Sequence, residues 1–232
     1  MEKIVGILGG MGPLATADLF KKITLLTRAA SDNEHLRVVI DSNAKIPDRT
    51  SAILSGGADP VPQMLSALRN LERCGADVIL MPCNTAHHFL PRLQTETNVP
   101  FLNMIETTVA RCKELFPGKT AGLWATSGTV KSGVYTDVLA REGVACVLPT
   151  EAEQAVMMDA IYRVKGGETL RDSAAFDGLA ASMGVRGADY FILGCTELPI
   201  VYDMLHLKGN FIDPTAELAR AAILYCGKEL NA

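Results

Sequence analysis

Short runs of hydrophobic residues alternate along this chain with longer segments in which hydrophobic positions recur at helical spacing. The short runs predict β-strands at residues 3–8, 37–40, 78–81, 101–102, 120–124, 145–148, 190–193 and 211–212. The longer segments predict helices over residues 14–29, 61–73, 106–115, 132–141, 151–164, 170–183 and 216–230. Strands that alternate with helices in this way are typical of parallel sheets with helices on both faces.

The chain also contains an internal repeat. The segment GADVILMPCNT at residues 75–85 is echoed by GADYFILGCTE at residues 187–197, and in each copy an apolar run ends at a cysteine. Two further blocks repeat in the same order: Lys3, Gly6 and Gly12 as Lys119, Gly122 and Gly128, and residues 101–103 as residues 211–213. The repeats predict two related halves, although strand ends resemble one another in any α/β protein.

The predicted fold is therefore an α/β fold of two pseudo-symmetric lobes. Each lobe is a parallel sheet of about four strands flanked by helices, with the active site in the cleft between the lobes. The last helix follows the second half, and we expect it to return and complete the first lobe. On this division residues 1–104 with 210–232 form the N-terminal lobe, and residues 105–209 form the C-terminal lobe.

Composition narrows the range of partners. The chain of 232 residues has a net charge of −4, and its lysines and arginines are scattered, which disfavours nucleic acid and anionic membranes as partners. The first predicted strand begins at once, without a signal peptide, and no apolar run approaches membrane-spanning length. We therefore expect a cytoplasmic protein whose six cysteines are mostly reduced. No cysteine or histidine spacing is typical of a zinc site, and the adjacent His87 and His88 point in different directions, so we expect no metal.

The two repeated cysteines are the strongest candidates for chemistry. Cys83 and Cys195 each follow a buried strand and precede an expected helix start. Free amide groups and a partial positive charge at a helix amino terminus favour the thiolate, and such sites lower a cysteine pKa from about 8.5 to roughly 3.5–7.5. A thiol that titrates near neutrality accepts or donates a proton at one site. The alternative is a pair of buried structural cysteines, which is the preferred interpretation for the other four: Cys74, Cys112, Cys146 and Cys226.

The loops after the first strand of each half are candidate anion sites. Residues 9–13 read GGMGP, with Met11 at the centre, and the counterpart at residues 125–129 reads ATSGT, with hydroxyls on Thr126 and Ser127. Glycines allow backbone N–H groups to approach a carboxylate or phosphate. Further side-chain donors lie beside the cysteines: Asn84, Thr85 and Thr196. Ordinary turns and helix caps are the alternative.

The first loop also fits a loose dinucleotide pattern, Gly10-x-Gly12-x-x-Ala15. The ribose-binding acid would then be Asp41, which lies 26 residues beyond Ala15 instead of about 20. A nicotinamide or flavin enzyme is therefore a weaker hypothesis, and it leaves the repeated cysteines unexplained.

Three charged residues are ambiguous from pattern alone. Arg49 and Lys165 are both compatible with plain surface charges. Glu197 follows Cys195 by two positions, where it either takes up protons beside the thiol or begins a helix.

The segments at residues 9–13, 83–86, 125–129 and 194–197 together resemble the signature blocks of the aspartate/glutamate racemase superfamily. The resemblance implies two pseudo-symmetric lobes, usually a homodimer, and no pyridoxal phosphate or metal. It also implies that Cys83 and Cys195 are the two active-site cysteines. Glutamate racemases usually have Asp-Ser-Gly and Gly-Cys-Thr-His in the first and last of these blocks. This chain has GGMG at residues 9–12 and GCTE at residues 194–197, and is most similar to aspartate racemases. In aspartate racemases an arginine and a lysine bind the substrate carboxylates. Arg49 and Lys165 stand where those two are expected.

The function implied is racemisation of L- and D-aspartate, and to a lesser extent of glutamate, by two opposed cysteine bases. The residues expected to bind the substrate are Met11, Arg49, Asn84, Thr85, Thr126, Ser127, Lys165 and Thr196, with Glu197 in support. Glutamate, broad-specificity and hydantoin racemases, maleate isomerases and arylmalonate decarboxylases share the scaffold, so resemblance alone leaves the reaction open. A two-lobed protein that only binds an acidic ligand is the non-enzymatic alternative.

Overall fold

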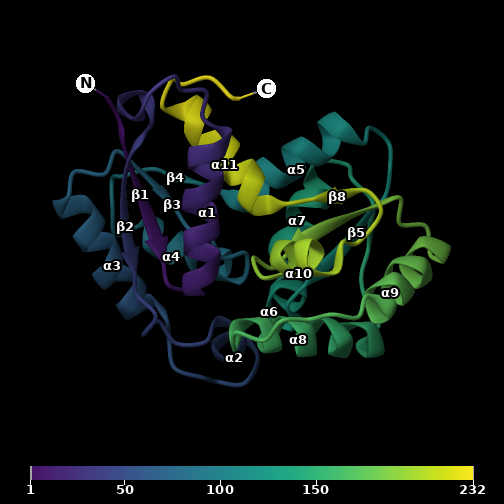
Figure 1. Ribbon diagram of the computed structural model, residues 1–232. Helices are drawn as coiled ribbons and strands as arrows, with labels where there is room; N and C mark the ends of the chain where they lie inside the picture. Colours follow the sequence, from purple (N-terminus) through teal and green to yellow (C-terminus); the bar gives the residue numbers. More distant parts are fainter. Residues whose placement is uncertain (1, 232) are drawn as a thin grey trace.

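Two four-stranded parallel sheets form the frame of the computed structural model, which describes residues 2–231 (Figure 1). The first sheet has the order β2-β1-β3-β4, with β1 at Ile4–Gly9, β2 at Arg37–Ser42, β3 at Val78–Leu80 and β4 at Phe101–Leu102. The second has the order β6-β5-β7-β8, with β5 at Ala121–Ala125, β6 at Cys146–Val147, β7 at Tyr190–Gly194 and β8 at Phe211–Ile212. The equivalent order of strands confirms the predicted α/β fold of two pseudo-symmetric lobes.

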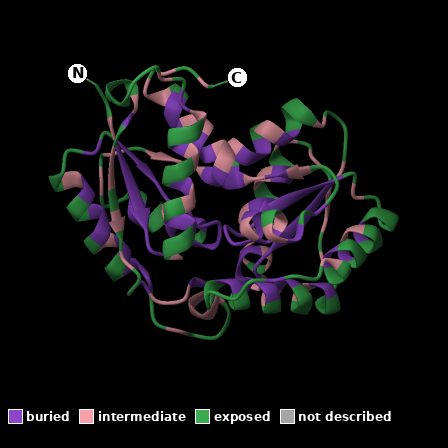
Figure 2. Ribbon diagram, viewed as in Figure 1, coloured by how far each residue is buried: buried purple, intermediate pink, exposed green. Residues whose placement is uncertain are grey.

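Helices cover both sheets, and the buried strands lie between helices whose outer faces are exposed (Figure 2). The helices that the pattern predicted are α1 (Pro13–Leu26), α3 (Val61–Arg73), α5 (Met104–Leu115), α7 (Val134–Arg141), α8 (Glu151–Lys165), α9 (Ala174–Val185) and α11 (Pro214–Tyr225). The structure adds α2 (Arg49–Leu54), α4 (Leu90–Gln94), α6 (Ser127–Ser132), α10 (Leu198–Leu205) and the 3-10 turns η1 (Asp32–Glu34) and η2 (Thr85–Phe89). Apart from α10, these additional elements have six residues or fewer and are too short to show a clear helical period in the sequence.

The internal repeat is also present in the hydrogen bonding. The Asp77 carboxylate accepts from Ile4 N at 2.7 Å, and Asp77 N donates to Ile4 O at 2.8 Å. In the second lobe the Asp189 carboxylate accepts from Thr120 N at 2.8 Å, and Asp189 N donates to Thr120 O at 2.9 Å. The same aspartate therefore joins the start of the first strand to the start of the third in both lobes.

The repeated glycines at the strand centres have a packing role. A Cβ atom on Gly6 would lie 2.9 Å from the Ala76 side chain, and one on Gly122 would lie 3.2 Å from the Ala188 side chain and 2.5 Å from the Phe191 ring. Distances this short exclude a side chain. The turn before the third strand therefore packs directly on the first strand in each lobe.

Helix α11 leaves the second sheet and packs on the first lobe, where Leu218 and Ile223 are buried with Val5 and Ile7 of β1. Strand β8, however, hydrogen-bonds to β7. Residues 211–212 therefore belong to the second sheet and not to the N-terminal lobe, in which residues 210–232 were expected. The return to the first lobe begins at α11, and residues 1 and 232 lie outside the described range.

The two lobes touch closely where α2 meets α6. A Cβ atom on Gly128 would lie 3.0 Å from Thr50 Cα and 3.0 Å from the Thr85 methyl group. Glycine at this position therefore lets the second lobe approach the first. The approach closes the space between the carboxyl ends of the two sheets, where open α/β folds bind ligands.

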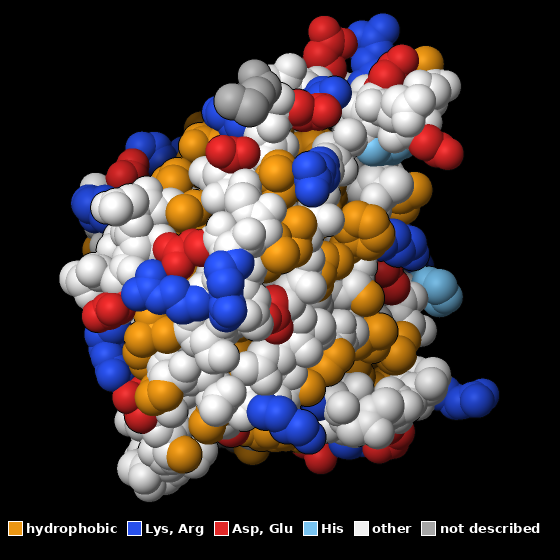
Figure 3. Space-filling model, turned by 90° about the vertical axis from the view of Figure 1, so that its left-hand side faces the viewer, with side chains coloured by type: hydrophobic (Ala, Val, Ile, Leu, Met, Phe, Trp, Pro, Cys, Tyr) orange, Lys and Arg blue, Asp and Glu red, His pale blue; other side chains and the backbone are white. Residues whose placement is uncertain are grey.

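The helices formed by residues 2–231 do not include one that is both long and apolar enough to span a bilayer. Across the outer face of the first lobe, lysine and arginine side chains lie beside aspartate and glutamate side chains (Figure 3). The charge of that face is therefore mixed.

Candidate active site

One pocket collects residues from both lobes at the carboxyl ends of the two sheets. The empty space within it, counted together with the open solvent at its mouth, is about 250 Å³. Its lining consists of Met11, Asp48, Arg49, Thr50, Cys83, Asn84 and Thr85 from the first lobe, and Lys165, Cys195, Thr196 and Glu197 from the second. All the predicted site residues except Thr126 and Ser127 are therefore brought together.

Thr126 and Ser127 lie outside the pocket lining. Thr126 caps α6, and its hydroxyl lies 2.9 Å from the Thr85 hydroxyl and 3.0 Å from that of Thr129, which is itself 2.8 Å from Thr85. Ser127 directs its N–H to the Met158 sulfur at 3.2 Å. The three threonines form a buried hydroxyl cluster that connects the lobes, so Thr126 contacts a pocket residue and not the pocket itself.

Cys195 is held as a neutral thiol. Its Sγ donates to Glu197 Oε2 at 3.0 Å, and both residues are buried. Burial raises the pKa of the Cys195 thiol well above its ordinary value, and the Glu197 charge raises it further, whereas Lys165 opposes the shift. The expectation that a nearby helix amino terminus favours the thiolate is therefore wrong for this cysteine, because burial and an adjacent carboxylate dominate.

Lys165 supplies a positive charge from the second lobe. The residue as a whole is exposed on the last turn of α8, but its side chain lines the pocket. Burial of the ammonium lowers the pKa of Lys165, but negative charge at Cys195, when it is ionised, and at Glu197 raises it, and the net shift is upward. Lys165 therefore remains protonated and is available to bind an anion.

Arg49 supplies a fixed positive charge from the first lobe. It is buried at the start of α2, and its guanidinium donates to Pro47 O at 2.9 Å, Met11 O at 3.0 Å and Ile46 O at 3.2 Å. Because a guanidinium has five N–H donors, these three bonds leave one on Nε and one on Nη2 for a ligand. The pair has the geometry that binds a carboxylate through both oxygens.

Asn84 lines the same pocket and carries a buried donor without a partner. Its Oδ1 accepts from the Tyr135 hydroxyl at 2.7 Å, whereas its Nδ2 is buried and has no hydrogen-bond partner among residues 2–231. A buried donor without a partner is costly unless a ligand accepts from it. This amide is therefore the clearest indication that the pocket binds an acceptor such as a carboxylate.

His87 fixes the backbone of Cys83. The His87 Nδ1 lies 2.9 Å from Cys83 O, and Nε2 accepts from Met104 N at 3.1 Å. Since Nε2 is an acceptor, Nδ1 carries the proton and the ring is neutral. Burial lowers the pKa of His87 to about 4, so the ring stays neutral in this role.

Asp48, Thr50 and Tyr135 were not among the residues that the sequence pattern singled out, and His87 was considered only as a metal ligand. Asp48 caps α2 by accepting from Ser51 N at 2.7 Å, and an aspartate at this spacing is a recognisable helix start. Tyr135 carries no such local signal, because it occupies an ordinary buried position of α7. Within residues 2–231 no cluster of three His, Cys, Asp or Glu side chains is placed to hold a metal ion.

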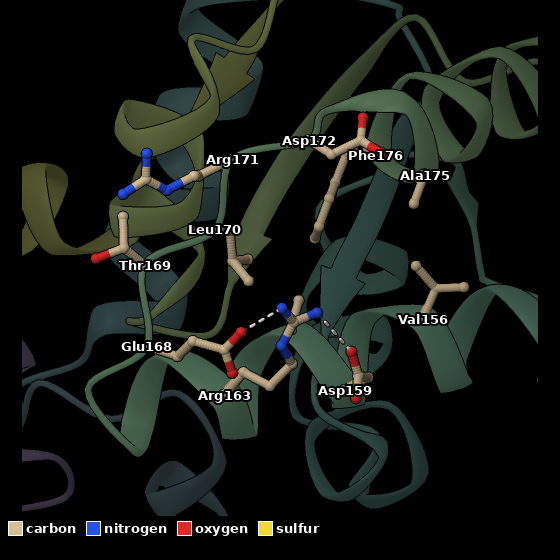
Figure 4. Close-up of a pocket in the computed structure, with 11 residues that line it drawn as sticks. Val156, Asp159, Arg163, Glu168, Thr169, Leu170, Arg171, Asp172, Ala175 and Phe176 are labelled. Atoms are coloured by element: carbon tan, nitrogen blue, oxygen red, sulfur yellow. Dashed lines mark hydrogen bonds and ion pairs between the residues drawn. The ribbon is translucent and has the colours of Figure 1, made fainter.

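A larger surface hollow of about 800 Å³ lies beside α8 and the segment before α9 (Figure 4). Arg163 crosses it between Glu168 and Asp159, the latter at 3.3 Å. Its lining contains neither cysteine nor histidine. We therefore assign the chemistry to the smaller pocket between the lobes, where the thiols lie.

Comparison with known proteins identifies the family of the chain. The model of the family described as Asp/Glu/Hydantoin racemase matches residues 8–222. The chain is 28% identical over 234 residues to the broad specificity amino-acid racemase RacX of Bacillus subtilis (strain 168), covering 95% of this chain and 96% of that protein.

Solved structures are similar over nearly the whole chain. Picrophilus torridus aspartate racemase superposes with a TM-score of 0.87 at 34% identity, covering 99% of this chain and 96% of that chain. A glutamate racemase from Francisella tularensis in complex with D-glutamate has a TM-score of 0.68 at 17% identity, covering 97% of this chain and 81% of that chain. At that identity the second similarity concerns the fold alone.

Proposed function

The chain belongs to the Asp/Glu/hydantoin racemase family and is an amino-acid racemase of that family, and we propose that it interconverts L- and D-aspartate by proton transfer between Cα and two cysteine thiols. The observation that carries the proposal is that Cys83 and Cys195, from different lobes, line one pocket with Arg49 and Lys165. The similarity to Picrophilus torridus aspartate racemase supports the choice of aspartate. The chain's own residues perform the proton transfer, so the proposal requires no added cofactor.

The reaction begins with the two cysteines in different states. Cys195 carries a proton and hydrogen-bonds to Glu197, and we assign the role of base for the first enantiomer to Cys83. The Cα–H bond breaks, its electron pair stays on the substrate, and the proton forms an S–H bond on Cys83. Cys195 then gives its proton to the opposite face of Cα and becomes the thiolate. The other enantiomer reacts with the state that this leaves: the Cys195 thiolate takes the α-proton, and the Cys83 thiol gives its proton to the opposite face of Cα, which restores the starting state.

The substrate carbanion must be stabilised by the protein. We assign the α-carboxylate to donors beside the cysteines, namely the Asn84 amide, the Thr85 hydroxyl and the Thr196 hydroxyl. Negative charge grows on that carboxylate as the α-proton leaves, so donors fixed in place stabilise the transition state more than the ground state. The positive charge of Lys165 acts in the same direction.

We assign the side-chain carboxylate of aspartate to Arg49. Three backbone carbonyls hold its guanidinium in place, so it cannot retreat to accommodate a longer side chain. Glutamate has one methylene more than aspartate, a difference that changes binding by about 1–3 kcal/mol. We therefore expect racemisation of glutamate to be about ten- to two-hundredfold less efficient.

The test uses L-aspartate in heavy water, without added cofactor, and chiral analysis of the product. We expect D-aspartate and deuterium at Cα from the parent. Cys83→Ala and Cys195→Ala should each lose racemisation, and each should retain at most slow exchange of one enantiomer. The control is Cys74→Ala, since Cys74 is exposed and outside the pocket, and it should keep the parent rate.

Two outcomes would contradict the proposal in different ways. Racemisation of other amino acids without racemisation of aspartate would overturn the substrate, and the similarity to a broad specificity racemase makes a panel of amino acids the right comparison. Racemisation at the parent rate by either cysteine variant would overturn the two-base mechanism. The homodimer and the cytoplasmic location stay predictions, the first of which sedimentation or light scattering would check.

A further inference from the structure

Tyr135 lies outside the pocket lining but contacts Asn84, a residue of that lining. It lies on α7 of the second lobe and its side chain is fully buried. Its hydroxyl donates to Asn84 Oδ1 at 2.7 Å, and Asn84 directly follows Cys83 in the first lobe. This hydrogen bond connects the second lobe to Asn84, which lines the pocket.

This bond is the observation from which we infer which end of the Asn84 amide faces the pocket. An asparagine side chain has one oxygen that accepts and one nitrogen that donates. Because the Tyr135 hydroxyl occupies the oxygen, the nitrogen is left without a partner among residues 2–231, although only 1% of Asn84 is exposed. The reversed amide would present its oxygen to the pocket, where it would repel a carboxylate.

We propose that Tyr135 is a positioning residue for racemisation, which holds the Asn84 amide so that its N–H groups face the α-carboxylate of the substrate. The inference rests on the proposed function. The Tyr135 hydroxyl does not contact the substrate in this proposal, and it affects the reaction only by orienting the Asn84 amide. Burial raises the pKa of Tyr135 well above its ordinary value, so the hydroxyl keeps the proton that it donates.

The perturbation is Tyr135→Phe, which removes the oxygen and preserves the buried ring. The amide is then free to turn, and donation to the growing charge on the α-carboxylate weakens. We expect kcat/KM to fall about ten- to a hundredfold, the range for a hydrogen bond to a charged group, with a large part of the loss in kcat. Tyr202→Phe is the matched control because Tyr202 packs on Phe211, outside the pocket, and it should keep the parent kinetics.

A double-mutant cycle separates positioning from general structural damage. If Tyr135 acts through Asn84, Tyr135→Phe should have no further effect on kcat/KM in an Asn84→Ala background. Losses that multiply in the double variant, or parent kinetics for Tyr135→Phe, would overturn the inference. The cycle is measured with whichever amino acid the parent racemises, because every amino acid has an α-carboxylate. A parent that is inactive on aspartate but active on another amino acid would therefore contradict the proposed substrate and leave the cycle valid.

A second variant covers the case in which Tyr135→Phe fails to fold. Asn84→Asp keeps an oxygen that accepts from the Tyr135 hydroxyl but replaces the N–H donor by a carboxylate oxygen. We expect kcat/KM at least as low as that of Asn84→Ala, because the new charge repels the substrate carboxylate. Kinetics similar to the parent would show that the amide nitrogen does not face the substrate, and the inference would fail.

Discussion

The buried His87 should make the stability of this protein depend on pH in a defined range. The ring contacts Cys83 O through Nδ1 and Met104 N through Nε2, and burial lowers its pKa from 6.5 to about 4. The unfolded chain takes up a proton on this histidine below pH 6.5, whereas the folded protein does so only below about pH 4. Between these values the unfolded state binds more protons, so stability rises with pH.

The size of the effect follows from the two pKa values. The difference between 6.5 and about 4, at roughly 1.4 kcal/mol for each tenfold change in proton affinity, corresponds to about 3 kcal/mol. This contribution is fully present above pH 6.5 and is lost as the pH falls to about 4. It is a sizeable part of the 5–15 kcal/mol by which domains are ordinarily stable.

The assay is urea unfolding of the parent and His87→Asn at several values between pH 4 and pH 7. The asparagine amide is placed to keep the donor to Cys83 O, loses the acceptor for Met104 N and does not titrate. The variant should be less stable than the parent at pH 7, and the gap should narrow by about 3 kcal/mol towards pH 4. His88→Asn is the control because His88 is exposed, and its curve should run parallel to that of the parent. Parallel curves for the parent and His87→Asn would refute the reasoning.

Three further predictions concern the pocket and its frame. Glu197→Gln removes a charge that raises the pKa of the Cys195 thiol, so in a Cys83→Ala background the midpoint of Cys195 alkylation should move to lower pH; an unchanged midpoint would contradict the role given to the carboxylate. Arg49→Ala should raise KM for aspartate about ten- to a hundredfold, as measured by initial rates, and an unchanged dependence on aspartate concentration would remove Arg49 from the site. Gly10→Ala should lower the free energy of unfolding in denaturant by about 3 kcal/mol or more. Gly10 has φ of 90°, and a Cβ there would lie 2.3 Å from the Asn43 backbone. A loss below about 1 kcal/mol would show that the loop can move aside.

The fold was predictable because its signals are local and occur twice. Each buried strand is a short apolar run, and the turn before β3 and β7 carries the same Gly-Ala-Asp sequence. The aspartates of those turns, Asp77 and Asp189, make the same pair of hydrogen bonds in both lobes. The sequence alone therefore places one cysteine after the carboxyl end of the repeated strand in each sheet.

The parts of the site that the sequence did not reveal depend on contacts between distant segments. Tyr135 reaches Asn84 across 51 positions and from the other lobe, while its own helix shows only an ordinary buried aromatic residue. His87 and His88 are adjacent, and only the packing of η2 decides that the first is buried and the second exposed. No periodicity or spacing in the chain carries that information.

The thiolate expected at Cys195 was wrong for a related reason. A helix amino terminus is visible in a sequence, and its effect on a thiol has a known direction. Burial of that thiol depends on how the two lobes pack together, and the Glu197 carboxylate that adds its charge lies near Gly12 of the first lobe. The global packing therefore reversed a local expectation.

The duplication supplied two thiols but did not make them equivalent. In the repeat, the position of Glu197 beside Cys195 is taken by Thr85 beside Cys83, so one cysteine has an acidic partner and the other a threonine whose hydroxyl joins a buried cluster. L- and D-aspartate have the same free energy in water, so kcat/KM must be equal in the two directions of racemisation, whatever the protein does to either thiol. The unequal environments can therefore appear only in kcat and KM separately: an enantiomer that turns over faster must have a KM higher by the same factor.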